Sequence, residues 1–164
     1  MTNISVLILM GSDSDAPVMQ GAVDILKDLQ IPCEMTVASA HRSPERVTRL
    51  VSEAPARGVK VFIVGAGAAA HLAGVVAAHS TSPVIGVPID SSALKGLDAL
   101  LSTVQMPPGV PVATVSIGKP GATNAGVLAA QMLALADPAI AERLVAYKKR
   151  LAENVEAAAA RLQS

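Results

Sequence analysis

The sequence is poor in aromatic residues and in cysteine. It contains no Trp, one Phe, one Tyr and one Cys among 164 residues. A single cysteine, Cys33, cannot form a disulfide within the chain, and no Cys/His spacing indicates a zinc site. So few aromatic side chains argue against nucleic-acid binding by base stacking. We therefore expect no disulfide, no metal and no nucleic-acid partner, and we interpret Cys33 as a small buried residue.

Charged residues are also scarce, and their two signs cancel. The chain has 13 Lys and Arg against 13 Asp and Glu, together 16% of the residues, while 51% are hydrophobic. No basic stripe could follow a phosphate backbone. No apolar run is long enough to span a bilayer, and the N-terminus lacks the pattern of a signal peptide. We expect a cytoplasmic protein without membrane contact that buries apolar surface in a homo-oligomer.

Short apolar segments alternate with amphipathic ones along the whole chain. We expect strands at 4–10, 34–39, 60–64, 84–87 and 112–115, and helices at 16–29, 44–57, 70–79, 93–102 and 121–136. Such alternation predicts a parallel sheet covered by helices on both faces. The sequence thus predicts one α/β domain spanning 1–164, whose core (1–136) is a three-layer α/β/α sandwich with a five-stranded flavodoxin-like or Rossmann-like sheet.

The last predicted helix, 137–164, is too long for this sandwich. Asp137 is placed to cap it and Pro138 to open it. A continuous apolar stripe follows at Ile140, Leu144, Tyr147, Leu151, Val155, Ala158 and Leu162. At about 1.5 Å per residue it would extend roughly 35–40 Å, whereas a core strand spans about 17–20 Å. We expect a projecting C-terminal helix whose outer half packs on a neighbouring subunit.

Polar residues follow four of the predicted strands, at the edge where parallel sheets bind ligands. The four loops are 11–15 (GSDSD), 39–42 (SAHR), the glycine- and alanine-rich 65–72 (GAGAAAHL) and 86–90 (GVPID). The third loop lacks the spacing of a dinucleotide fingerprint and the lysine of a P-loop. Together the loops predict a cleft with a phosphate end near Ser14, Ser39 and Arg42 and a reacting end near His41.

His41 and Arg42 stand immediately before a predicted helix start, with Ser43 as N-cap and Pro44 as first helical residue. A proton carrier, a fixed cation and a helix N-terminus together favour an anion-binding reaction site. We expect His71 to serve either the ligand or the fold, and His79 to be structural at a helix end. With no metal cluster and no trustworthy Ser/His/Asp spacing, proton transfer and electrostatic positioning are the expected chemistry.

Several segments resemble the N5-carboxyaminoimidazole ribonucleotide mutase family, and the resemblance covers nearly the whole chain in order. It is carried by 11–15 (GSDSD), 39–44 (SAHRSP), 66–72 (AGAAAHL), 83–88 (PVIGVP), 96–107 (GLDALLSTVQMP) and 109–114 (GVPVAT). The resemblance implies transfer of a carboxylate from the exocyclic nitrogen to a ring carbon of an imidazole ribonucleotide in purine biosynthesis. It implies decarboxylation and recarboxylation without metal, ATP or biotin, in an octamer supplied by an ATP-dependent carboxyaminoimidazole ribonucleotide synthetase.

The same resemblance implies a role for each matching residue. His41 would be the proton shuttle. The implied substrate-binding residues are Ser12, Ser14, Asp15, Ser39 and Arg42 for phosphate and ribose, and Gly67, Ala68, His71 and Leu72 for the base and trapped carbon dioxide. The chain departs from the family pattern at Ala16, Ser43 and Ala73, where tryptophan, threonine and proline are usual.

Two other functions remain open at this point. The first is a direct aminoimidazole ribonucleotide carboxylase that uses carbon dioxide, although the 86–88 and 105–107 segments resemble the mutase class. The second is a non-catalytic flavin- or nucleotide-binding module of flavodoxin type. The scarcity of aromatic residues speaks against that module, because flavin rings commonly stack on such side chains.

Overall fold

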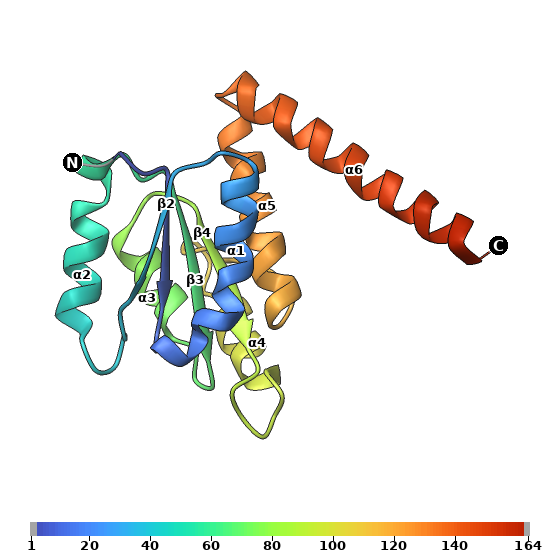
Figure 1. Cartoon of the computed structure of the whole chain (residues 1–164). Coiled ribbons are helices and arrows are strands. Elements are labelled where there is room, and N and C mark those ends of the chain that lie inside the picture. Colours follow the sequence, from blue (N-terminus) through green and yellow to red (C-terminus); the bar gives the residue numbers. More distant parts are fainter. Residues whose placement is uncertain (1–2, 163–164) are drawn as a thin grey trace.

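The computed structural model describes residues 3–162 and confirms the predicted α/β sandwich (Figure 1). Five parallel strands lie in the order β2-β1-β3-β4-β5, which is the flavodoxin-like arrangement. The strands are β1 (Val6–Met10), β2 (Cys33–Val37), β3 (Val61–Gly67), β4 (Val84–Ile89) and β5 (Ala113–Thr114). The α-helices are α1 (Ala16–Asp28), α2 (Pro44–Glu53), α3 (Leu72–His79), α4 (Leu97–Val104), α5 (Lys119–Ala134) and α6 (Pro138–Leu162).

Alternate residues of β1 supply the two halves of the core. Val6, Ile8 and Met10 belong to the cluster with α1 and α5, whereas Leu7 and Leu9 belong to the cluster with α2 and α3. Each of these five side chains is at most 5% exposed. Because a strand turns successive side chains to opposite faces, a strand covered on both faces must be apolar throughout. The unbroken apolar run in the sequence is therefore explained by the two helical layers.

The predicted boundaries of β3 and α2 were wrong. β3 continues to Gly67 instead of ending at 64, because Gly65 is paired with both β1 and β4 and the pairing with β4 continues to Gly67. That double pairing overrides the weak strand preference of glycine. α2 ends at Glu53 instead of 57, and a 3-10 turn (Pro55–Arg57) follows. Proline has no N–H for the helical hydrogen bond, which accounts for the change of helix type.

Other elements differ from prediction mainly in length. α3 begins at Leu72, with His71 as its N-cap, and α4 begins at Leu97. α5 begins at Lys119, two residues before the predicted start. β4 extends to Ile89, and β5 is reduced to two residues at the sheet edge. None of these differences alters the order of the strands or moves a loop to another edge.

α6 confirms the predicted long C-terminal helix and projects from the body (Figure 1). Its first half is attached to the domain: Ile140 is buried, Arg143 Nε donates to the carbonyl oxygen of Leu29 over 2.7 Å, and Arg150 pairs with Asp28. Residues 163 and 164 of the predicted helix lie outside the described residues. Between residues 3 and 162, no helix has both the length and the apolarity needed to cross a membrane.

Candidate functional site

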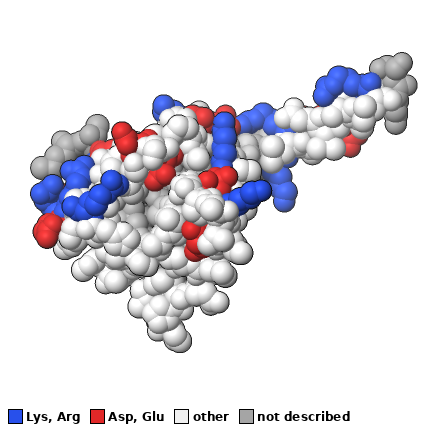
Figure 2. Space-filling view, turned by 90° about the horizontal axis from the view of Figure 1, so that it is seen from below, with Lys and Arg blue, Asp and Glu red and all other residues white. Residues whose placement is uncertain are grey.

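A cavity of about 310 Å³ lies at the carboxyl ends of the strands, within the size range of small-molecule sites. The first three polar loops line it, and Ser91, directly after the fourth loop, completes the lining. Figure 2 looks onto this edge of the sheet and shows charges gathered over one part of it beside a broad uncharged surface. Residues 61–118 contain only three charged side chains, Asp90, Lys95 and Asp98. The cavity therefore joins a polar wall to an apolar one.

The first loop, residues 11–15, gathers hydroxyls around a short 3-10 turn (Asp13–Asp15). Ser12 is the N-cap of this turn: its Oγ accepts from the backbone N–H of Ser14 at 3.4 Å and lies 3.0 Å from Ser14 Oγ. Asp15 is only 7% exposed. Its burial raises the pKa of the Asp15 carboxyl, while its hydrogen bond with the Ser12 backbone and the nearby Arg42 cation act in the opposite direction. The loop thus presents two hydroxyls and one largely desolvated carboxyl.

The second loop, predicted at 39–42, belongs to the connection 38–43 between β2 and α2, hereafter the His41 loop, which closes on itself through Ser39 and Ser43. The backbone N–H of Ser43 donates to the Ser39 carbonyl oxygen at 3.0 Å, and Ser43 Oγ accepts from the Ser39 backbone N–H at 3.2 Å. Ser43 occupies the predicted N-cap position of α2, but its hydroxyl makes no capping hydrogen bond to that helix. It is engaged by Ser39 instead, which makes the loop a closed ring.

Arg42 joins the His41 loop to the first loop. Its Nη2 donates to the carbonyl oxygen of Gly11 at 2.8 Å, and its backbone N–H donates to Ser39 Oγ at 3.2 Å. The guanidinium remains exposed at the cavity wall. Its Nε also donates to Ser39 Oγ at 3.4 Å, so the planar group is oriented by two contacts and its remaining Nη donors point in a fixed direction.

His41 and His71 both line the cavity, and their rings are in contact. Nε2 of His41 lies 2.7 Å from Nδ1 of His71, and the ring centroids are 4.9 Å apart at an interplanar angle of 83°. A hydrogen bond at this distance needs one nitrogen with a proton and one with a free lone pair. The sequence left open whether His71 serves the ligand or the fold. In the structure, His71 contacts the candidate proton carrier directly.

The third loop turns through an unusual backbone conformation. Ala68 and Ala70 have φ of 51° and 43°, in the left-handed region that side chains with a Cβ seldom adopt. The turn is closed by Ala70 N–H on the Gly67 carbonyl oxygen at 3.0 Å, and Ser102 of α4 donates to the carbonyl oxygen of Ala69. Strain of this kind persists only where surrounding contacts over-determine the loop.

The structure places most, but not all, predicted third-loop residues at the cavity. Gly67, His71 and Leu72 line it, whereas Ala68 is exposed and lies outside its lining, because the left-handed turn directs residue 68 away. A Cβ on Gly67 would lie 1.8 Å from Ser91 Oγ, so the backbone there approaches the fourth loop too closely for alanine. The sequence analysis ended the fourth loop at residue 90 and so missed Ser91.

The remaining candidates lie elsewhere. Cys33 is half-buried on β2, and burial raises the pKa of its thiol. His79 is the exposed last residue of α3. Ala16 is the first residue of α1, and Ala73, the second residue of α3, is buried and would lie 3.6 Å from a Cβ added at Gly86. Over residues 3–162, no three His, Cys, Asp or Glu side chains group as metal ligands would.

Comparison with known proteins shows which family the chain is similar to. The family model described as AIR carboxylase matches residues 5–154. The N5-carboxyaminoimidazole ribonucleotide mutase of Mycobacterium tuberculosis (strain H37Rv) is 55% identical over 156 residues, which are 95% of this chain and 88% of that protein. The phosphoribosylaminoimidazole carboxylase of Candida glabrata is 49% identical over 157 residues, 96% of this chain but 27% of that longer protein. The crystal structure of Treponema denticola PurE superposes with a TM-score of 0.86 at 30% identity, covering 97% of this chain and 98% of that one.

Proposed function

Because the chain belongs to the AIR carboxylase family, we propose that it is a mutase of purine biosynthesis that converts N5-carboxyaminoimidazole ribonucleotide to 4-carboxy-5-aminoimidazole ribonucleotide. The observation that carries the proposal is the convergence of an oriented guanidinium, several hydroxyls and a paired histidine on one cavity. A phosphate, a ribose and a base need these three kinds of contact in one place.

The phosphate end of the cavity is formed by Arg42 and the hydroxyls of Ser12, Ser14 and Ser39. Arg42 supplies a planar fork suited to phosphate oxygens, and the hydroxyls can rotate to donate to the same anion. Asp15, beside them, has acceptor oxygens for the ribose hydroxyls. We assign substrate binding to these side chains, with no metal or other cofactor.

The reacting end is His41, which we assign as the proton shuttle. As carbon dioxide leaves the exocyclic nitrogen, the imidazolium donates a proton to that nitrogen, and aminoimidazole ribonucleotide is formed. The ring carbon then attacks carbon dioxide, a C–C bond forms, and the imidazole accepts the proton released from that carbon. One histidine can perform both transfers, so the protons balance over the cycle without another reactant.

Carbon dioxide has no charge that a side chain can grip. Retention must come from apolar groups that exclude water, and the wall of Gly67, Ala70 and Leu72 supplies them. Ala70 and Leu72 are 3% and 2% exposed, so this wall belongs to the packed core. His71 stands between the wall and His41, close to the place where the carboxylate would be exchanged.

The second candidate is direct carboxylation of aminoimidazole ribonucleotide, favoured by the name of the Candida glabrata relative. A substrate assay separates the two. The proposed mutase must convert the N5-carboxylated nucleotide without added bicarbonate, and the wild-type chain is tested beside His41→Asn. Turnover only of the uncarboxylated nucleotide with bicarbonate would replace the mutase assignment by the carboxylase.

We also propose that the working form is a cytoplasmic homo-octamer that receives its substrate from an ATP-dependent carboxyaminoimidazole ribonucleotide synthetase. Two exposed apolar surfaces support self-association. One is on α6, and the other contains Leu94, Leu97, Leu101 and Val104, which are 47–62% exposed. Surfaces of this kind on one chain are typical of subunit interfaces. Light scattering of the purified chain measures the number of subunits.

A further inference from the structure

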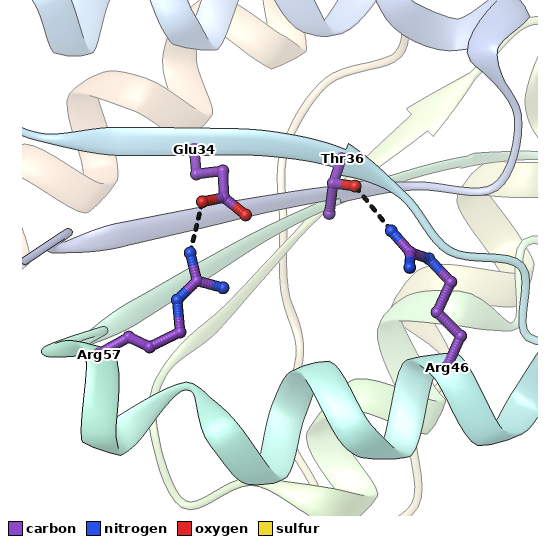
Figure 3. A network of polar contacts seen from close by, with 4 residues as sticks. All are labelled: Glu34, Thr36, Arg46 and Arg57. Carbon is purple, nitrogen blue, oxygen red and sulfur yellow. Dashed lines mark hydrogen bonds and ion pairs between the residues drawn. The ribbon is translucent and has the colours of Figure 1, made fainter. Parts of the chain in front are cut away.

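Arg46 makes a contact that sequence analysis did not foresee. It lies in the first turn of α2, and its side chain reaches the carboxyl end of β2 (Figure 3). Nε donates to the carbonyl oxygen of Val37 at 2.8 Å, and an Nη2 proton goes to Thr36 Oγ1 at 3.0 Å. Arg46 is half-buried, so these bonds are partly shielded from water. It thus links a helix start to a strand end.

The strand end held by Arg46 lies at the edge of the sheet. β2 pairs with β1 alone, and the backbone N–H of Ala38 continues that pairing to the Met10 carbonyl oxygen at 2.9 Å. The other side of an edge strand has no strand to satisfy its polar groups. Arg46 supplies donors on that side, so the last residues of β2 are held from both directions.

The His41 loop connects the end of β2 to the start of α2, the two elements that Arg46 joins. It leaves β2 after Val37 and enters α2 at Pro44, and it carries Ser39, His41 and Arg42. Its internal ring, Ser39 to Ser43, fixes the shape of the loop but not its position on the sheet. The bonds of Arg46 join both ends of the loop directly and therefore fix that position.

We propose that Arg46 is a positioning residue for the reaction: it holds the His41 loop so that His41 and Arg42 face the cavity together. This inference rests on the proposed function and extends it to a residue outside the candidate cavity lining. Arg46 borders a shallow hollow on the other side of Arg42, shared with Ser12 and Ser39. Its guanidinium acts through the strand end and not through the substrate.

The same helix and strand offer a matched control. Arg57, in the turn after α2, pairs with Glu34 near the start of β2 (Figure 3). Both arginines therefore tie the α2 region to β2, but only Arg46 does so beside the His41 loop. The Arg57 and Glu34 side chains are 22% and 40% exposed, so water partly screens this ion pair and limits its contribution to stability. Arg57→Met also removes a cation and a contact to β2, but at the end of the strand that is distant from the cavity.

The first test is steady-state kinetics on Arg46→Met and Arg57→Met, since Met keeps a long unbranched side chain. Small displacements of reacting groups can cost about a hundredfold in rate, so we expect kcat/KM of Arg46→Met to fall by about tenfold to a hundredfold. Both kcat and KM should change, because His41 and Arg42 move with the same loop. We expect Arg57→Met to stay within about twofold of wild type. Equal losses in the two variants would overturn the proposal.

Thr36→Val separates positioning from a long-range effect of the Arg46 charge. It removes one acceptor of Arg46 and leaves every charge in place. We expect a smaller loss than in Arg46→Met, and no further loss when Thr36→Val is added to Arg46→Met, as for two partners of one interaction. Wild-type kinetics in Thr36→Val, or additive losses in the double variant, would show that the charge acts by itself and would overturn the proposal.

Amide hydrogen exchange gives a readout that does not depend on turnover. The N–H groups of Ser39, Arg42 and Ser43 are bonded within the His41 loop, and we expect them to exchange faster in Arg46→Met but not in Arg57→Met. Unchanged exchange in Arg46→Met would refute positioning. A wild-type chain without mutase turnover would refute the proposed function instead, and the exchange result would still decide the role of Arg46 in the loop.

Discussion

Nε2 of His41 and Nδ1 of His71 lie 2.7 Å apart, in rings that meet edge to face. A bond between two imidazole nitrogens needs one proton and one lone pair, so it selects the tautomers of both rings together. While the bond lasts, Nε2 of His41 is engaged by His71. Proton exchange with a ligand then uses Nδ1 of His41 or follows separation of the rings. The candidate proton shuttle is thus a pair with a defined orientation.

His41→Asn is the direct test of the shuttle. Asn keeps a polar side chain of moderate size but cannot exchange protons near neutral pH. We expect turnover to fall by at least about a hundredfold, the lower range for loss of general acid–base catalysis. Nucleotide binding should remain measurable by calorimetry, because the phosphate contacts are left intact. His79→Asn, an exposed histidine at the end of α3, is the control and should keep wild-type turnover. Near wild-type turnover in His41→Asn would exclude the shuttle.

Arg42→Lys tests the phosphate end of the cavity. Lysine keeps the charge but loses the planar fork that the Gly11 carbonyl oxygen orients. A hydrogen bond to a charged group is worth about 1.5–3 kcal/mol, so we expect affinity for the nucleotide to fall by roughly tenfold or more. Arg49→Lys, on the exposed side of α2, controls for the exchange of residue type. Equal affinity of wild type and Arg42→Lys in calorimetry would contradict the phosphate assignment.

Asp15→Asn should lower turnover and raise the free energy of unfolding near neutral pH. Burial raises the pKa of the Asp15 carboxyl, which means that the folded chain binds its proton more tightly than the unfolded chain does. The ionised carboxyl therefore destabilises the fold at neutral pH, and this cost disappears as the pH falls from the raised pKa through the ordinary value.

Asn is neutral at every pH and avoids that cost. Urea unfolding should show Asp15→Asn to be more stable than wild type near neutral pH, with the difference shrinking toward a pH of about 4. Turnover should fall, since an acceptor for the ribose is lost. Glu53→Gln, at the exposed end of α2 and away from Asp15, reports the change in net charge alone. A stability difference that grew on acidification would contradict the sign of this argument.

The fold could be predicted from the sequence because its signals are local. The apolar run of β1 reflects burial on two faces, and the proline and glycine residues mark many of the turns. Boundaries were wrong where pairing overrides local preference, as at Gly65 and Gly67, which sit in a central strand with a neighbour on each side. A loop and the end of a buried strand look alike in sequence when both are made of small residues.

The sequence predicted which loops form the site but not the contacts between their side chains. The carboxyl ends of parallel strands must share one edge, so Ser12, Ser39 and His41 were expected together. The partner of His41 was not, because His71 lies 30 residues further along and its approach depends on the left-handed turn at Ala68 and Ala70. Arg46 was missed for a similar reason: an arginine in the first turn of a helix resembles a solvated one until the strand beside it is seen.

α6 supplies the last prediction, because the structure leaves its outer half uncovered by its own chain. Beyond Arg150, which pairs with Asp28, Leu151, Val155 and Leu162 are 48%, 66% and 90% exposed. Burying one such side chain contributes about 1.5–3 kcal/mol, which is a strong reason for a second subunit to cover this stripe. The alternative is an isolated helical extension with no role in assembly.

Leu151→Asp combined with Val155→Asp places two charges on the stripe without shortening the helix. We expect association to weaken by at least about a hundredfold, since the apolar contribution of both residues is lost. Light scattering should then report a smaller particle, while circular dichroism shows unchanged helix content. Glu153→Gln alters the charge of the same turn off the stripe and should leave the particle mass as in wild type. An unaltered mass in the double variant would assign the oligomer to other surfaces, with the apolar side chains of α4 as the next to be tested.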